Sequence, residues 1–173
     1  MKLNLFALPL LATLASSLRL DPVWTQYNVQ TGAQTWNTPE GLIRKNADIT
    51  TIYTFDFGYS NVGKTCTFGF DRPYESTGTK QADLFSVIGN PTSSTTGFPR
   101  QAPRNQYIAR LQVGNDLFGA TTWISPSQAP SFPCPSGKVS WELVPAGDNV
   151  VIKHKYAYIP RGRVPSGLFV EAN

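Results

Sequence analysis

Two neighbouring stretches alternate large apolar side chains with polar or small ones, and this alternation constrains the fold more than any other feature. The apolar positions are Tyr53, Phe55 and Phe57 in residues 51–57, and Cys66, Phe68 and Phe70 in residues 64–71. A two-residue period built from aromatic and β-branched residues is typical of half-buried strands. Gly58 to Gly63 supplies a turn between the two stretches, so the sequence predicts a hairpin here.

The second stretch also carries one of the two cysteines of the chain, and its only possible partner is Cys134. Two cysteines in an exported chain predict one disulfide, here Cys66–Cys134. Closing so long a loop is worth about 4 kcal/mol in the chain-entropy model. We therefore expect the strand around Cys66 to be tied to a distant loop.

Further strands are predicted along the chain, with turn signals between them. They cover residues 22–30, 82–88, 105–113, 117–124, 139–144, 150–158 and 168–171. The prolines around Cys134 predict an extended connection rather than a strand, and residues 145–149 a hairpin-type loop. No segment shows a sustained helical period. The expected fold class is all-β: a single-domain antiparallel β-sandwich or jelly roll with one disulfide.

The chain begins with the pattern of an exported protein. Met1-Lys2 is a short basic start, Leu3 to Leu14 is an apolar run, and small residues surround Ala15. This pattern predicts a secretory signal peptide over residues 1–17, because a membrane-spanning helix would need about 20 apolar residues. We expect one domain over residues 18–173, secreted, with no transmembrane segment.

The charged residues suggest one class of candidate site, a basic surface that binds anionic ligands. The formal net charge is +4, or +3 once Lys2 is removed with the signal peptide, which is too mild to predict nucleic-acid binding. The densest basic group consists of Lys153, Lys155, Arg161 and Arg163. Such a group could bind acidic polysaccharide, phospholipid headgroups or phosphorylated glycans. The alternative is an exposed strand face whose lysines protect a sheet edge from aggregation.

The four tryptophans, Trp24, Trp36, Trp123 and Trp141, could supply a flat platform for sugars, although aromatic residues are more often core. Trp141 alternates with core positions and is expected to be buried. Trp36 lies in a polar stretch beside Asn37 and Pro39, predicted as a loop, and is the best exposed candidate.

Catalytic chemistry has little support in the sequence. His154 is the only histidine, no Gly-X-Ser-X-Gly motif accompanies it, and flanking lysines are expected to lower its pKa, so a structural or surface role is favoured. Two distant thiols and one histidine do not make a metal site, and we expect neither metal nor cofactor. Paired carboxylates could hydrolyse glycosides, and the candidates are Asp56, Asp71, Asp83 and Glu142. Glu142 alternates with apolar neighbours and is expected to face solvent.

Several short motifs occur in an order that resembles one family. They are Cys66-Thr67-Phe68-Gly69-Phe70, Ala82-Asp83-Leu84-Phe85, Arg104-Asn105-Gln106-Tyr107, Pro133-Cys134-Pro135, Ser140-Trp141-Glu142-Leu143 and Gly167-Leu168-Phe169-Val170-Glu171. Over residues 50–173 the chain resembles the fungal But-two C-terminal domain family, usually secreted proteins of unknown function. The resemblance implies a fungal β-sandwich with the cysteine pair bridged. The family is named for association with a ubiquitin-like-activating enzyme, an intracellular partner that does not fit an exported chain.

These observations predict a secreted, non-catalytic fungal protein associated with the cell surface or cell wall. Its expected partner is cell-wall polysaccharide or another extracellular surface ligand, and not nucleic acid. Two alternatives stay open: a secreted hydrolase that acts on glycans through paired carboxylates, and a protein that acts on a host or competitor, for example at membranes.

Overall fold

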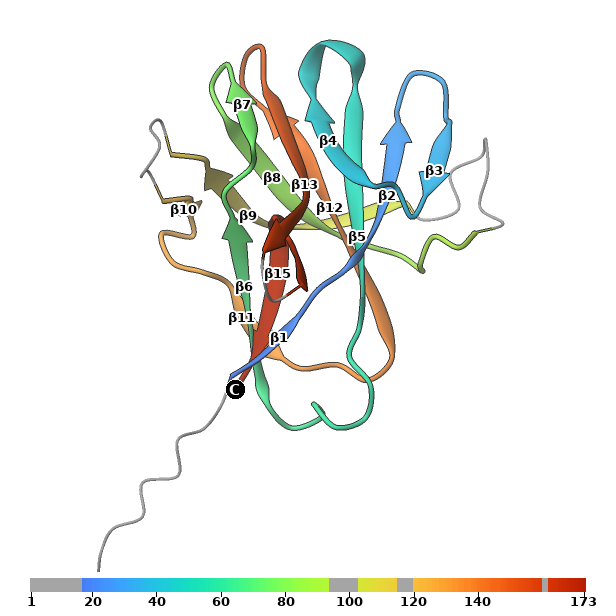
Figure 1. Ribbon diagram of the computed structural model, residues 1–173, viewed down its shortest axis with the longest axis vertical. Helices are drawn as coiled ribbons and strands as arrows, with labels where there is room; N and C mark the ends of the chain where they lie inside the picture. Colours follow the sequence, from blue (N-terminus) through green and yellow to red (C-terminus); the bar gives the residue numbers. More distant parts are fainter. Residues whose placement is uncertain (1–16, 94–102, 115–119, 160–161) are drawn as a thin grey trace, which may run out of the picture.

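The computed structural model describes residues 17–93, 103–114, 120–159 and 162–173, with the backbone alone for 156–159 and 162–165. Within these ranges the chain forms antiparallel strands and one short 3-10 turn, Lys45–Ala47, and contains no α-helix. The predicted fold class, an all-β sandwich with one disulfide, is confirmed (Figure 1). The predicted signal peptide falls almost entirely in residues 1–16, outside the described residues.

The smaller sheet has four strands within the described part of the chain, and it brings the two ends of the domain together. Its order is β1 (Leu18–Leu20), β15 (Gly167–Ala172), β6 (Thr65–Asp71) and β11 (Ser131–Pro133). The strand β6, which carries the aromatic alternation around Cys66, is therefore central in this sheet. It pairs with the last strand of the chain on one side and with a short strand on the other.

The larger sheet contains the remaining eleven described strands and curls strongly across its width (Figure 1). Its main path is β10 (Thr122–Ser125), β9 (Arg104–Gln112), β8 (Gln81–Val87), β12 (Lys138–Ala146), β5 (Ile49–Asp56), β4 (Glu40–Arg44), β13 (Val151–Ile159) and β14 (Gly162–Pro165). Beside this path, β2 (Val23–Asn28) pairs with β5 and β3 (Gln34–Trp36), and β7 (Glu75–Thr77) pairs with β13.

The strands β4 and β5 pair through their backbones only at Arg44 and Ile49. Next to this position, the Thr51 side chain replaces the missing backbone hydrogen bonds between the two strands. The Thr51 hydroxyl accepts a hydrogen bond from the Leu42 amide at 3.1 Å and donates one to the Leu42 carbonyl at 3.0 Å. The Thr51 side chain thus satisfies both backbone hydrogen-bonding groups of Leu42 where the two strands are not paired.

The aromatic alternation predicts the strands correctly, but the predicted hairpin is wrong. β5 and β6 do not pair; the loop over residues 58–63 carries the chain from one sheet to the other. Their aromatic faces meet in the core instead. The ring centroids of Phe57 and Phe68 lie 5.9 and 5.0 Å from that of Trp141, approached from opposite sheets. Alternation reveals that each strand has a buried face, but not which layer it belongs to.

Three smaller predictions also need correction. Residues 131–133 form the edge strand β11, in which the lack of an N–H at Pro133 is tolerated, rather than a connection without strand structure. Trp36 ends the strand β3 and does not lie in a loop. The loop over residues 147–150 does not close a hairpin, because β12 pairs with β5 and β8 while β13 pairs with β4, β7 and β14.

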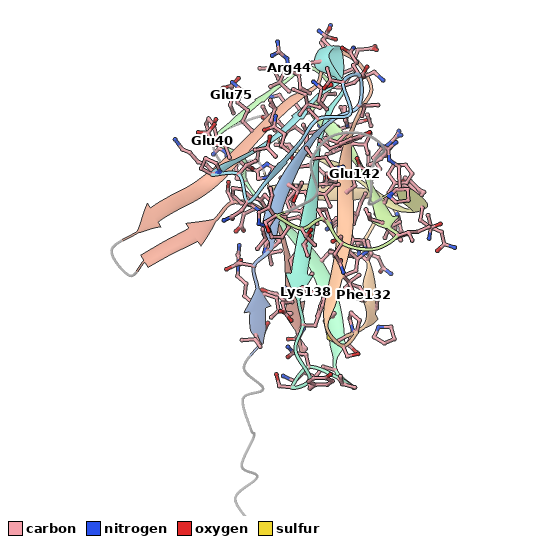
Figure 2. The ribbon with its side chains drawn as sticks, turned by 90° about the vertical axis from the view of Figure 1, so that its right-hand side faces the viewer. Glu40, Arg44, Glu75, Phe132, Lys138 and Glu142 are labelled. Carbon is pink, nitrogen blue, oxygen red and sulfur yellow. A yellow bond between two sulfur atoms is a disulfide. The ribbon has the colours of Figure 1, made fainter. Side chains whose placement is uncertain are left out.

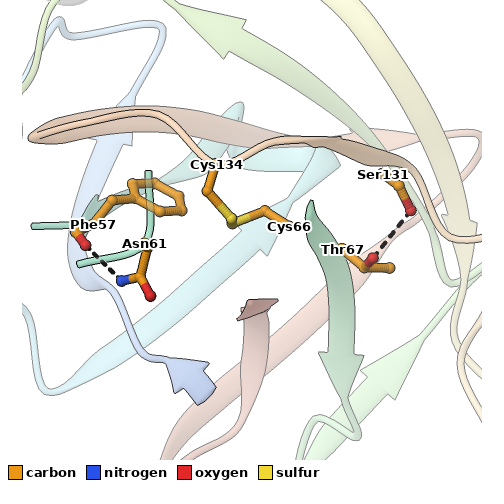
Figure 3. Close-up of a disulfide and its surroundings, with 6 residues drawn as sticks. All are labelled: Phe57, Asn61, Cys66, Thr67, Ser131 and Cys134. Carbon is orange, nitrogen blue, oxygen red and sulfur yellow. Dashed lines mark hydrogen bonds between the residues drawn. A yellow bond between two sulfur atoms is a disulfide. The ribbon is translucent and has the colours of Figure 1, made fainter. Parts of the chain in front are cut away.

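The disulfide Cys66–Cys134 is present, as predicted, and both sulfur-bearing residues are buried (Figure 3). It joins the start of β6 to the residue that follows β11, with 5.0 Å between the two Cα atoms. A hydrogen bond of 3.0 Å between the hydroxyls of Thr67 and Ser131 adds a second link between these strands. The short edge strand is thereby fixed to the sheet.

Candidate functional site

A hollow lies beside the aromatic side chain of Trp36. It measures about 450 Å³, and its described lining residues are Trp36, Asn90, Pro91, Thr92, Ser93 and Lys138. Trp36 is half-buried and lies opposite Thr25 in the register of β3 and β2, so both side chains are on the same face of the sheet. The structure thus surrounds the predicted aromatic candidate with polar side chains.

The position of Asn90 in this hollow is fixed by hydrogen bonds to β12. Its side-chain amide donates to the Lys138 carbonyl at 3.0 Å, and its side-chain oxygen accepts from the Ser140 hydroxyl at 2.7 Å. Ser140 also bonds to the Thr54 hydroxyl at 2.8 Å. Ser140 and Thr54 are buried, so the segment that carries Asn90 is attached to the sheet through a desolvated polar network.

Lys138 contributes the only cationic side chain among the described lining residues of this hollow. It is exposed, and within the described residues it forms no ion pair. We refer to Trp36, Asn90, Thr92 and Lys138 as the Trp36 site. An aromatic face bordered by an amide, a hydroxyl and an ammonium group can bind a sugar ring by stacking and hydrogen bonding.

The basic group predicted from the sequence is less available. Lys153 binds Glu75 through an ion pair of 2.8 Å, and this hydrogen bond raises the pKa of Lys153. The ammonium of Lys155 lies 4.6 Å from the ring centroid of Tyr74, whose hydroxyl points to Glu40. Figure 2 shows Glu40 and Glu75 at the upper left of the view, and Lys138 lower, near the middle. Both lysines therefore already have partners within the protein: Lys153 pairs with Glu75, and Lys155 lies against the ring of Tyr74.

The other two members of the group cannot be placed beside them. Arg161 lies outside the described residues, and of Arg163 only the backbone, in β14, is described. Their proposed contact with ligand stays a prediction.

His154 is a buried structural side chain. It is fully inaccessible, its Nε2 lies 2.8 Å from the Tyr53 hydroxyl, and its ring centroid lies 4.9 Å from that of Trp24. Gly41 is packed so closely against the imidazole that a Cβ there would come within 1.9 Å of Nε2. Burial lowers the pKa of His154 from 6.5 to about 3, so the ring is neutral. The expected direction is correct, but desolvation and not the flanking lysines causes it.

The prediction that Glu142 faces solvent is wrong. Its side chain is inaccessible, accepts a hydrogen bond of 2.6 Å from Thr50, and binds Arg104 at 3.0 Å. Arg104 in turn lies over the ring of Phe85, 4.9 Å from its centroid. The outer face of β12 is covered as well as the inner one, which alternation between apolar and polar residues could not reveal.

The other candidate carboxylates are also engaged. Asp83 receives two hydrogen bonds from Arg110, at 2.6 and 2.9 Å, and Asp71 binds Arg19 at 2.6 Å. Asp56 accepts a hydrogen bond from the Gly58 amide at 3.3 Å. Asp83 and Glu142 lie on the same face of β8 and β12, but a different arginine occupies the oxygens of each.

Comparison with known proteins adds no assignment: no protein-family model matches the chain, and no curated protein is significantly similar to it. The resemblance to the But-two family therefore stays a prediction. In the described ranges, no three His, Cys, Asp or Glu side chains are grouped as metal ligands would be. None of the helical structure described is long and apolar enough to cross a bilayer.

Sequence reasoning identified Trp36 but not its neighbours. Asn90 and Thr92 flank Pro91 in a stretch that predicts a turn, and Lys138 begins a strand far along the chain. Nothing local in the sequence links these residues to Trp36. The only available signal is the cluster of turn-forming polar residues over 89–93, which commonly marks surface loops that carry function.

Proposed function

We propose that this protein is a secreted, non-catalytic protein that binds polysaccharide at the cell surface or cell wall, through the Trp36 site. The observation that carries the proposal is the hollow in which a half-buried tryptophan is bordered by polar side chains on a rigid sheet. Export is supported by the sequence of residues 1–17 and by the disulfide, because such bonds persist mainly in oxidising compartments. The resemblance to secreted fungal proteins of the But-two type points the same way.

In this proposal a sugar ring stacks on the accessible part of the Trp36 indole. Its hydroxyls exchange hydrogen bonds with Thr92 and with the groups around Asn90, which the β12 network holds in place. A fixed site loses little conformational entropy on binding. Lys138 adds a preference for polymers that carry carboxylate or phosphate groups.

The hydrolase alternative has weaker support. Hydrolysis of a glycosidic bond needs two carboxyl groups that are free to reach the bond, one as proton donor. Arginines occupy Asp83 and Glu142, and Glu142 is inaccessible. We therefore prefer binding without catalysis.

The test is retention of the purified protein on insoluble wall polymers, namely β-glucan, chitin and mannan. We expect the wild-type protein to be retained by at least one polymer, and Trp36→Ala to lose at least about tenfold in affinity, the typical effect of removing an aromatic anchor. Trp36→Phe keeps a ring and should retain part of the affinity. Thermal melts of each variant show that the fold is intact.

Tyr74→Ala is the matched control, because Tyr74 is an exposed aromatic residue next to the Lys155 side chain and outside the Trp36 site. It should bind like the wild type. If Tyr74→Ala lost retention and Trp36→Ala kept it, the ligand would bind beside Lys153 and Lys155 and not at the Trp36 site. No retention of the wild-type protein on any polymer would overturn the proposal.

A further inference from the structure

The loop between β5 and β6 exposes two apolar side chains at one end of the molecule. Tyr59 is 90% exposed, the highest fraction among the large apolar residues described, and Val62 is 57% exposed. Figure 1 shows this loop at the lower end of the longest axis of the molecule. We call residues 58–64 the tip.

The tip is held by hydrogen bonds at both ends. The Phe57 amide donates to the Gly137 carbonyl at 3.0 Å, and the Phe57 carbonyl accepts from the Asn61 side chain at 2.6 Å (Figure 3). The Lys64 amide donates to the Asn61 carbonyl at 3.1 Å, and the disulfide follows two residues later. The backbone is thus fixed before any partner binds, which lowers the entropic cost of association.

Residues 57–70 contain Ser60, Thr65 and Thr67 and no acidic residue. Two acidic side chains flank this stretch: Asp56 accepts a hydrogen bond from the Gly58 amide, and Glu171 lies opposite Thr67 in the sheet. Next to the tip lies a hollow of about 390 Å³, whose described lining includes Lys64, Thr65, Ser131 and Phe132. An ammonium and two hydroxyls can bind the oxygens of a phosphate or carboxylate. Exposed apolar side chains beside a cationic group match the layered chemistry of a lipid surface, with acyl chains below and charged headgroups above.

We propose that the tip docks on a phospholipid surface with anionic headgroups: Tyr59 and Val62 enter the interfacial layer, and Lys64 contacts the headgroups. Tyrosine is enriched at membrane interfaces because its ring is apolar and its hydroxyl stays hydrated. Val62 decides between lipid and polysaccharide as the partner. An aliphatic side chain offers a sugar neither a stacking surface nor a hydrogen bond, whereas it gains from burial among acyl chains.

The test is co-sedimentation of the full chain with phosphatidylcholine vesicles, with and without phosphatidylserine. We expect binding that rises with phosphatidylserine. The double variant Tyr59→Ser/Val62→Ser should bind at least about fivefold less, since each side chain loses its transfer into the apolar layer. Lys64→Gln should bind less only to vesicles that contain phosphatidylserine. Ile88→Ser is the control, because Ile88 is as exposed as Val62 but lies outside the tip.

A second measurement reports the depth of the tip directly. In Tyr59→Trp, vesicles should shift the added indole fluorescence to shorter wavelength, and brominated lipid should quench it. Equal vesicle binding by the wild type and the double variant, or an unchanged Tyr59→Trp signal, would overturn the proposal. Trp36→Ala should bind vesicles normally, so failure of this proposal is distinguishable from failure of the polysaccharide proposal. Polysaccharide retention that depends on Tyr59 and Val62 would assign the tip to sugar instead.

Discussion

Acidification should destabilise this protein through one residue, His154. The imidazole is enclosed by side chains from both sheets, among them Tyr53, Trp24 and Phe70, and its Nδ1 has no hydrogen-bond partner within the described residues. None of the described ring and backbone neighbours is a carboxylate that could balance a positive charge. Protonation in the folded state therefore places an uncompensated charge in the core.

The lowered pKa of His154 sets both the direction and the size of the pH effect on stability. Folding lowers the pKa of His154 from 6.5 to about 3, so the unfolded chain takes up the proton first. The corresponding stability is complete above the unfolded pKa and is lost as the pH falls below it. The full penalty is about 5 kcal/mol, and the part incurred between about pH 7.5 and about pH 4.5 is about 3 kcal/mol. This is a large fraction of the free energy of unfolding of an ordinary domain.

The assay is urea unfolding, followed by tryptophan fluorescence, for the wild type and His154→Gln over this pH range. Glutamine does not titrate and can still bond to the Tyr53 hydroxyl. The variant will be less stable at neutral pH, but the difference between the two proteins should shrink by about 3 kcal/mol on acidification. All other ionisable groups are the same in the two proteins, so their contributions cancel in the comparison.

Parallel pH profiles of wild type and His154→Gln would refute this reasoning. If the variant does not fold, the single histidine of the chain still permits a direct measurement. The imidazole proton resonances of the folded wild-type protein should not shift between about pH 8 and about pH 5, because the folded-state pKa lies below that window. A titration with a midpoint near 6.5 would contradict the burial argument.

Two further predictions concern the polar network and the disulfide. Glu142→Gln should lower the free energy of unfolding by about 2 kcal/mol in urea titrations, because Arg104 loses its charge partner at a desolvated site. The matched control Glu75→Gln removes a surface partner of Lys153 and should cost less than about 1 kcal/mol; equal losses would contradict the assigned burial. Replacing both Cys66 and Cys134 by alanine should cost about 4 kcal/mol, since a 68-residue separation is released in the unfolded chain. Reduction of the wild-type protein should give a similar shift of the urea midpoint, and an unchanged midpoint would refute the stabilising role.

The amino-acid sequence by itself determined most of the longer strands and the disulfide. Alternation over residues 51–57 and 139–144 is a local signal, since a period of two gives one face to the core in any sheet. The pairing of Cys66 with Cys134 needed only a count of two. A structural or surface role of His154, rather than a catalytic one, was also favoured from the sequence, because no catalytic motif accompanies it.

Only the tertiary structure decided which strands pair and what covers their second faces. The sequences of β5 and β6 both predict an aromatic face, yet the two strands belong to different sheets. Strand pairing depends on partners that are distant in the chain. The sequence predicts that Glu142 faces solvent, whereas in the folded protein Thr50 and Arg104 bind it and the side chain is buried. Trp36 gained its site in the same way, from Asn90 and Lys138. Periodicity records whether a side chain alternates with its neighbours, whereas burial and binding depend on segments that folding brings from elsewhere.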